Sequence, residues 1–341
     1  MSKRPTSADV ATEAGVSRTT VSFVLNDRTD VKIPAATRRR VTEAAERLGY
    51  HPNASARRLA AGRSRMLALV MRQTPEQIAG DAVLAETLRG IATAARVDGY
   101  RVMVEPLEAD GSHSYSGLLR AQHADGLIIS GPRLDDPQLA ALVHEGFPVV
   151  LQGSLPGLPV PSVDVDNVAG AQRAVEHLLS LGHRRIACIT NAPLVYTSAV
   201  TRLEGYRRAL GAAGIAEDPD LIEEAAFDAP SGNAAMLRLI ERATCDAVFV
   251  ASDVVALGAI GALRETGRRV PADISVIGFD DIPLAPYVDP PLTTVRLPAF
   301  ELGQAAGRAL LARIADPDAS GRTLLPTELI VRASTAPPRR D

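Results

Sequence analysis

The feature that most constrains this chain is a regular alternation of short apolar segments with amphipathic helical segments, which begins at Met66. Apolar runs such as residues 67–70 and 127–129 have the length of buried strands. Strands that alternate with helices are parallel, because each helical crossover returns the chain to the same end of the sheet. The alternation therefore predicts an α/β fold of parallel sheets with helices on both faces.

The alternation occurs twice, on either side of a proline-rich segment at residues 154–161. We expect strands at residues 66–70, 100–104, 125–130, 148–151, 185–190, 246–251 and 274–279, and a short strand that ends at Ala225 and Phe227. We expect helices at residues 83–99, 114–122, 137–145, 168–181, 202–213, 231–242 and 254–266. Two similar halves in tandem predict two lobes with a cleft between them, where ligands bind beyond the carboxyl ends of the strands.

Polar side chains stand where several of these strands end. Gln152 follows one strand, Ser252 and Asp253 follow a second, and Asp280 and Asp281 follow a third. Asp253 directly precedes a predicted helix, so we favour a helix-capping role for it over a ligand role. Asp280 and Asp281 precede no clear helix, which favours a ligand role for that pair.

The first 26 residues predict two short helices joined by a tight turn. Thr6 or Ser7 can cap the first helix and Ser17 the second, and Gly15 ends the first because glycine adopts the left-handed conformation without steric cost. The face of the second helix opposite its apolar side carries Arg18, Thr19, Ser22, Phe23 and Asn26. The layout is that of a helix-turn-helix, whose second helix enters the DNA major groove, or of an ordinary helical hairpin.

The distribution of charge favours DNA binding. Residues 1–63 contain twelve Lys/Arg and six Asp/Glu and the remainder contains 25 and 34, so the net charge of −3 divides into +6 and −9. A basic head on an acidic body is typical of a nucleic-acid-binding module. A third helix is predicted at residues 36–48, and the arginines at 38–40 in its first turn oppose the helix dipole, which a phosphate would relieve.

Residues 53–62 have a good helix cap in Asn53 and a good stop in Gly62, which allows about two turns of helix. A helix of that length is not stable alone in water. The segment is therefore either a linker or a segment that folds when the protein binds DNA.

Several classes of protein are not supported by the sequence. No apolar run is long enough to span a membrane, and no apolar segment follows the basic N-terminus, so we expect a cytoplasmic protein. Cys188 and Cys245 lie in apolar surroundings, which predicts reduced thiols rather than a disulfide or a metal site. The phosphate-binding, dinucleotide, nucleophile-elbow and zinc-protease motifs are missing, so we expect no enzyme, no cofactor and no metal.

Taken together, these features resemble those of the LacI/GalR family of transcriptional regulators, and the resemblance covers nearly the whole chain. In the head, the motifs are Asp9-Val-Ala-x-x-Ala-Gly-Val-Ser17, Thr20-Val-Ser, Val24-Leu-Asn, Leu48-Gly-Tyr-x-Pro-Asn-x-x-Ala56 and Arg57-x-Leu59. In the body, they are His177-Leu-x-x-Leu-Gly-His-Arg184, Arg202-x-x-Gly-Tyr206, Asp253-x-x-Ala-Leu-Gly258, Pro271-x-Asp-Ile-Ser-Val-Ile-Gly-Phe-Asp-Asp281 and Pro290-Pro-Leu-Thr-Thr-Val295.

The resemblance implies a small all-α helix-turn-helix head on a two-lobed α/β body like that of periplasmic binding proteins. The implied divisions are a DNA-binding domain at 1–48, a hinge helix at 49–63 and a core at 64–341. Within the core, the first lobe takes residues 64–165 and 298–326, and the second takes 166–294 and 327–334. The family works as a homodimer on a near-palindromic operator in double-stranded DNA, and the chain shows no leucine heptads for a coiled-coil tetramer.

The resemblance also assigns residues to DNA. Arg18, Thr19 and Phe23 take the positions that read bases, and Phe23 departs from the polar residue of other members, so it either contacts a thymine methyl or packs on the head. Ser17, Thr20, Ser22 and Asn26 suit phosphate contacts. In the hinge helix, which begins at Asn53, Leu59 would wedge into the minor groove and Ala56 would face the dimer mate.

For the small-molecule effector, the resemblance implies Arg202 and Asp280 as hydrogen-bonding groups for a sugar or related polyol and Phe227 as an apolar wall. Ser252 and Gln152 stand at positions that are often Asn and sometimes Asp, which leaves the effector's identity open. The resemblance implies a repressor, although the sequence does not say whether the effector releases the protein from DNA. The alternatives are a periplasmic solute-binding protein, which has no use for a basic head, and a sugar-modifying enzyme fused to a DNA-binding head.

Overall fold

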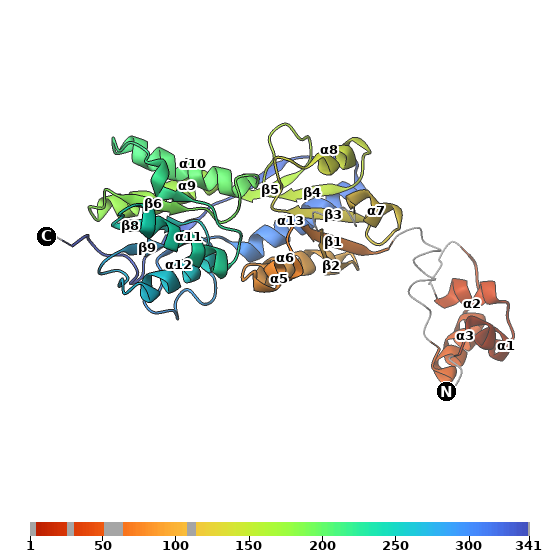
Figure 1. The fold of residues 1–341 in the computed structure, drawn as a ribbon. Helices are drawn as coiled ribbons and strands as arrows, with labels where there is room; N and C mark the ends of the chain where they lie inside the picture. The colour runs from red at the N-terminus through yellow and green to blue at the C-terminus, as the bar shows by residue number, and fades with distance from the viewer. Residues whose placement is uncertain (1–4, 26–30, 51–63, 108–113, 340–341) are drawn as a thin grey trace. The chain divides into compact units, whose positions relative to one another are not determined.

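The computed structural model of the protein describes residues 5–25, 31–50, 64–107 and 114–339, and the chain forms two compact units, residues 1–65 and 66–341 (Figure 1). Four residues with predicted DNA contacts, Asn26, Asn53, Ala56 and Leu59, lie outside the described residues. No helix in the described ranges is long and apolar enough to cross a membrane.

The first unit contains the three predicted helices, α1 (Ser7–Ala14), α2 (Arg18–Leu25) and α3 (Ala35–Leu48). Thr6 caps α1 through a reciprocal pair of hydrogen bonds with Asp9, and Gly15 ends the helix at a φ of +62°. The Ser17 hydroxyl oxygen accepts from the Thr20 amide at 3.1 Å, as the sequence predicted. The core of this unit consists of Val10, Ala11, Ala14, Val21, Val24, Val41, Ala44 and Ala45.

The second unit contains two sheets. The first is a parallel sheet of six strands in the order β11-β5-β4-β3-β1-β2. Its strands are β1 (Met66–Met71), β2 (Arg101–Pro106), β3 (Gly126–Ser130), β4 (Val149–Gln152), β5 (Ser162–Val165) and β11 (Arg322–Leu325). Helices α6 (Leu84–Val97) and α13 (Ala299–Ala315) cover one face, and α7 (Tyr115–Arg120) and α8 (Pro137–His144) cover the other. Figure 1 labels β1 to β5 and these four helices, together with the short helix α5 (Pro75–Gly80).

The second sheet is parallel, with four strands in the order β7-β6-β8-β9. Its strands are β6 (Ile186–Ile189), β7 (Ile222–Glu223), β8 (Ala247–Val250) and β9 (Ser275–Ile277), and a 3-10 turn η1 (Pro219–Leu221) precedes β7. Helices α9 (Asn167–Ser180) and α10 (Thr197–Ala212) cover one face, and α11 (Ala229–Arg242) and α12 (Asp253–Glu265) cover the other. An antiparallel pair, β10 (Thr294–Arg296) and β12 (Glu328–Ile330), lies beside it.

The chain passes between the two sheets three times, after β5, after β10 and after β11. The alternation in the sequence did not reveal β5, which is a four-residue strand directly after a proline-rich loop, and the predicted helices did not include α13. The predicted strand ending at Ala225 and Phe227 was wrong, since β7 ends at Glu223 and Phe227 lies in a bend with a φ of +68°. Helix α10 begins five residues before the predicted start at Arg202.

The two cysteines have reduced thiols, as predicted. Cys188 is fully buried in β6 and Cys245 is half-buried just before β8. Burial raises the pKa of both thiols, to about 11 for Cys245. Neither thiol is therefore an activated nucleophile at neutral pH.

Candidate functional site

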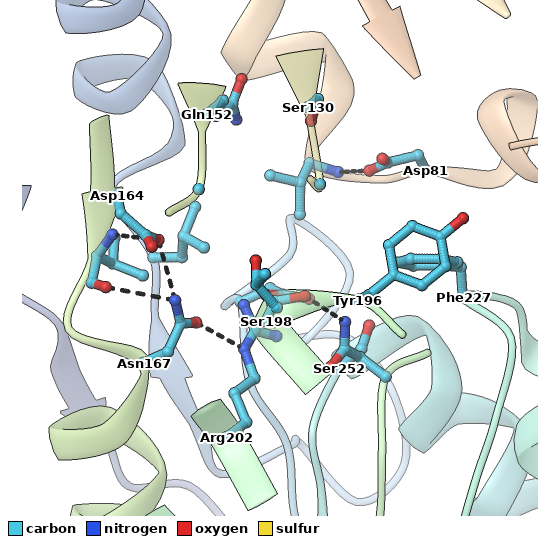
Figure 2. A pocket seen from close by; sticks show the side chains of 18 of the residues that line it. Asp81, Ser130, Gln152, Asp164, Asn167, Tyr196, Ser198, Arg202, Phe227 and Ser252 are labelled. Carbon is cyan, nitrogen blue, oxygen red and sulfur yellow. Dashed lines mark hydrogen bonds and ion pairs between the residues drawn. The ribbon is translucent and has the colours of Figure 1, made fainter. Parts of the chain in front are cut away.

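A pocket lies in the second unit between the two sheets and is lined by residues of both (Figure 2). The lining includes the carboxyl ends of β3 and β4 from the first sheet and the loops that follow β6, β8 and β9 in the second. The structure brings together at this pocket every residue assigned to the effector from the sequence: Gln152, Arg202, Phe227, Ser252 and Asp280.

The centre of the pocket is a buried ion pair. Arg202 Nη1 lies 3.2 Å from Asp280 Oδ1, and the two side chains are only 7% and 8% exposed. The same Nη1 donates to the Ala251 carbonyl oxygen at 2.6 Å, and the guanidinium stacks 3.8 Å from the centroid of the Phe279 ring. Contacts on several sides hold the arginine in one orientation, which is the preorganisation that a binding site requires.

Arg202 is also the end of a chain of hydrogen bonds that runs across the cleft. Arg202 Nε donates to Asn167 Oδ1 at 2.9 Å, and Asn167 Nδ2 donates to Asp164 Oδ1 at 3.0 Å (Figure 2). Asp164 belongs to β5 of the first sheet, whereas Arg202 belongs to α10 beside the second. The chain therefore links the two lobes at the first crossing between the sheets.

The carboxylate of Asp280 is held in an unusual environment. Burial raises the pKa of Asp280 to about 6, while Arg202 and the Ser252 hydroxyl act in the opposite direction. The backbone of Asp280 has a φ of +118°, a conformation that non-glycine residues rarely adopt. Backbone strain and a perturbed carboxyl at one position are typical of a functional site.

This environment gives a prediction about pH. Between about pH 4 and 6, the folded protein binds a proton at Asp280 that the unfolded chain releases, so the free energy of unfolding should fall as the pH rises through this window. The Asp280→Asn variant lacks this titrating group, so the part of the fall that Asp280 causes, about 1–3 kcal/mol over the whole window, should be absent from its free energy of unfolding. Urea unfolding of both proteins at several pH values measures the difference, and parallel curves would contradict the assigned pKa.

The neighbouring aspartates do not act as the sequence suggested. The Asp253 carboxylate does not cap α12: it accepts from Thr294 Oγ1 at 2.6 Å and from the Ile282 amide at 3.0 Å. It thereby fixes the loop that carries Asp280. Asp281, for which a ligand role was also favoured, does not line this pocket, and its carboxylate pairs with Arg296 and Arg332.

Two aromatic rings form one wall of the cleft. Tyr196 and Phe227 meet edge to face with their centroids 4.8 Å apart. The Tyr196 hydroxyl donates to the Arg72 carbonyl oxygen at 2.6 Å, which joins the second lobe to the first. The Leu134 amide also crosses, since it donates to the Val195 carbonyl oxygen at 2.8 Å. These two hydrogen bonds therefore connect the lobes beside the cleft.

Three residues that line the cleft have buried side-chain oxygens that accept no hydrogen bond within the described part of the chain. The side-chain oxygens of Gln73, Gln152 and Asn191 are buried, and none of them accepts a hydrogen bond from the described residues. An unsatisfied buried acceptor is costly, and because these three oxygens have almost no accessible surface, their side chains must move before a ligand or a water molecule can donate to them. Only Gln152 of the three was identified from the sequence.

Other lining residues were also missed. Asn191 and Ser130 stand at strand ends, where the search for polar groups at strand ends could have found them. Asp164 was missed with its strand, and Asp81 and Tyr196 come from loops whose path the sequence pattern does not show. The lining residues that the sequence did not identify include Gln73, Asp81, Asp164, Asn167, Asn191 and Tyr196.

The second helix of the head presents the predicted surface. Arg18, Thr19 and Ser22 are exposed on α2, and Phe23 is half-buried. Partial burial of Phe23 does not decide between contact with a thymine methyl and packing on the head. The hydroxyls of Ser17 and Thr20 lie 2.9 Å apart at the start of the helix.

Known protein families match the head and the body of this chain separately. Residues 6–53 match the model of bacterial regulatory proteins of the lacI family, and residues 175–335 match that of a periplasmic binding protein-like domain. The HTH-type transcriptional regulator CelR of Thermobifida fusca is 38% identical over 97% of this chain and 98% of that protein. The HTH-type transcriptional repressor CytR of Escherichia coli K12 is 35% identical over 97% of this chain and 96% of that protein.

Solved structures show the same similarity. A complex of the regulator CelR with cellobiose has a TM-score of 0.75 and 37% identity, and the match covers 97% of this chain and 100% of that one. The lac repressor dimer bound to operator and the anti-inducer ONPF has a TM-score of 0.82 and 33% identity, with 98% and 100% covered. The similarity therefore extends over the head and the body together.

Proposed function

Because this chain belongs to the LacI family of bacterial transcriptional regulators, we propose that it is a repressor that binds a near-palindromic operator as a homodimer, under the control of a sugar or related polyol. The observation that carries the proposal is the cleft between the lobes with its fixed Arg202–Asp280 pair. Polyols offer donors and acceptors on every carbon, which suits such a lining.

We propose that α2 of the head and the hinge make the contacts with DNA. Arg18 and Thr19 read base edges in the major groove, where arginine suits guanine and threonine suits a thymine methyl or a base edge. Phe23 contacts a thymine methyl or packs on the head. Ser17, Thr20, Ser22 and Asn26 hold phosphates and so position the helix. Residues 49–63 serve as the hinge, in which Leu59 enters the minor groove and Ala56 faces the dimer mate.

The proposed control follows from the three crossings between the lobes. A ligand that bridges Asp280 and Arg202 of one lobe to Gln152 of the other favours one relative orientation of the lobes. That orientation sets the separation of the two hinge segments in a dimer and hence the affinity for DNA. The coupling is reciprocal: operator DNA changes the affinity for the effector by the same factor.

The relatives are transcriptional regulators rather than enzymes, and we propose that this chain catalyses no reaction on its ligand. Incubating the protein with its effector and recovering the ligand unchanged would support this. A regulator of bacterial transcription acts in the cytoplasm, where the DNA is, and this is the compartment that we propose.

Selection of binding sites from a randomised duplex pool, at a stated salt concentration, tests the DNA-binding part. We expect a two-fold-symmetric consensus with a flexible central step. Arg18→Ala should then weaken binding by about 1–3 kcal/mol and relax specificity at one symmetric position.

Arg47→Ala is the matched control for this prediction. Arg47 lies near the end of α3 and pairs with Glu13, so its loss should leave the consensus unchanged. If the selection enriches no sequence, with or without added sugars, the assignment of α2 as the reading helix is wrong.

A further inference from the structure

The charges that line the cleft are unbalanced. The carboxylates are Asp81, Asp164 and Asp280, whereas Arg202 is the one basic side chain among the described lining residues. We infer that the cleft selects an uncharged polyol and rejects its anionic forms, such as sugar phosphates and sugar acids. The inference rests on the proposed function and adds to it the charge class of the effector and two residues, Asp81 and Asp164, that enforce it.

Arg202 is poorly placed to bind an anion, because its charge is already used. Nη1 faces both Asp280 and the Ala251 carbonyl oxygen, and Nε donates to Asn167. The face of the guanidinium is covered by the ring of Phe279. To neutralise a phosphate, Arg202 would have to leave Asp280 buried without a cation, which is strongly unfavourable.

The two other carboxylates are held by neutral donors. Asp81 Oδ1 accepts from the amides of Val83 and Leu84 at 2.9 and 3.1 Å, at the start of α6. Asp164 accepts from the Val165 amide, the Ser154 hydroxyl and the Asn167 amide group. These donors fix the carboxylates but do not cancel their charge, and burial raises the pKa of both. Each ionised carboxylate near the cleft weakens binding of a ligand anion by about ten- to a hundredfold.

The unsatisfied hydrogen-bond acceptors of the cleft favour a ligand that donates hydrogen bonds. The amide oxygens of Gln73, Gln152 and Asn191 are buried acceptors, and they come from both lobes. Once a movement of its side chain exposes one of these oxygens to the cleft, a sugar hydroxyl can donate to it, whereas the oxygens of a doubly charged phosphate or of a carboxylate cannot. Replacing a hydroxyl by such an anion would set acceptor against acceptor in a buried space.

The test uses matched sets of ligands on the full-length protein. Neutral mono- and disaccharides, including glucose, ribose and cellobiose, are compared with glucose 6-phosphate, ribose 5-phosphate, glucuronate and cellobionate. The measurements are the thermal midpoint of the body and the affinity for a selected operator. We expect at least one neutral sugar to raise the midpoint and change operator affinity, and its anionic counterpart to bind at least tenfold more weakly.

The outcomes separate the two proposals. If an anionic counterpart binds as tightly as the neutral sugar or more tightly, the charge inference is overturned, while control by a sugar-like ligand stands. If no compound of either class changes midpoint or operator affinity, the sugar assignment of the proposed function is overturned, and the charge inference falls with it.

Substitutions then locate the selectivity. Asp81→Asn and Asp164→Asn keep an acceptor oxygen for the amides that these residues now bind, and each should narrow the neutral-to-anionic affinity ratio by about tenfold. Glu241→Gln, on the exposed side of α11, removes a charge away from the cleft and should leave the ratio unchanged. Far-UV circular dichroism and the thermal midpoint establish that the variants are folded. An unchanged ratio in both folded aspartate variants would contradict the role of these two residues.

Discussion

Arg202→Ala is expected to abolish the response to the effector and to lower the free energy of unfolding of the body by about 3–5 kcal/mol. The variant loses the ligand-binding guanidinium and also leaves Asp280 buried without its counter-charge. It further removes the donors to Asn167 and to the Ala251 carbonyl oxygen. Chemical unfolding, together with operator binding with and without effector, measures both effects.

Arg208→Ala on the same helix is the matched control for the Arg202 prediction. Its guanidinium pairs with Glu204 in an exposed i,i+4 pair, in which the side chains are 59% and 44% exposed. Such pairs contribute little to stability, so the variant should resemble the natural protein within about 0.5 kcal/mol. If Arg202→Ala retained the same effector response as Arg208→Ala, the cleft would not be the effector site.

Gly90→Ala is expected to destabilise the first lobe by about 3 kcal/mol or more, although alanine is the better helix former. Helices α6 and α13 cross with their backbones in contact at this residue. A Cβ at Gly90 would overlap the carbonyl oxygen of Phe300 and lie 2.7 Å from the amide nitrogen of Gln304. Since α13 also carries the chain back from the second lobe, separating these helices would disturb the crossings that we propose transmit the effector signal.

Gly211→Ala is the matched control for Gly90→Ala, because it makes the same substitution in a helix at a position where no neighbouring atom of the described chain would contact the added methyl group. Gly211 is exposed in α10, and a Cβ there would meet nothing within 4 Å. Alanine should be neutral or should stabilise the protein by up to about 1 kcal/mol. Thermal and urea unfolding of the two variants compare them directly. Equal stability of the two would show that the α6–α13 contact can shift without cost.

The comparison of sequence with structure separates residues that local chemistry places from residues that it does not. Gln152, Ser252 and Asp280 were found because the carboxyl ends of parallel strands meet at one edge of a sheet, so polar residues there converge. Arg202 and Phe227 came only from the family resemblance: Arg202 was predicted at a helix start, and Phe227, predicted at the end of a strand, has an apolar side chain that the search for polar groups at strand ends does not select. Asp281 shows the limit of the rule, since its side chain turns away from its neighbour's and pairs with Arg296 and Arg332.

The sequence by itself determined the elements that depend on neighbours a few residues away. Caps, glycine stops and helical periodicity located α1, α2 and α3 to within a residue or two, and apolar runs located most strands of the body. These features act over one or two turns of chain, so the local pattern carries them.

Only the tertiary structure decided how the cleft is completed. Asp164 and Asn167 lie beside Arg202 because the chain crosses between the sheets at that point, and Asp81 and Tyr196 reach the pocket from loops of different lobes. The packing of α13 on α6, across more than 200 residues of sequence, is likewise tertiary; the family resemblance had placed residues 298–326 in the first lobe but no local pattern paired these two helices. Such contacts depend on which lobe the returning chain joins, and that choice is set by burial across the whole body rather than by any local pattern.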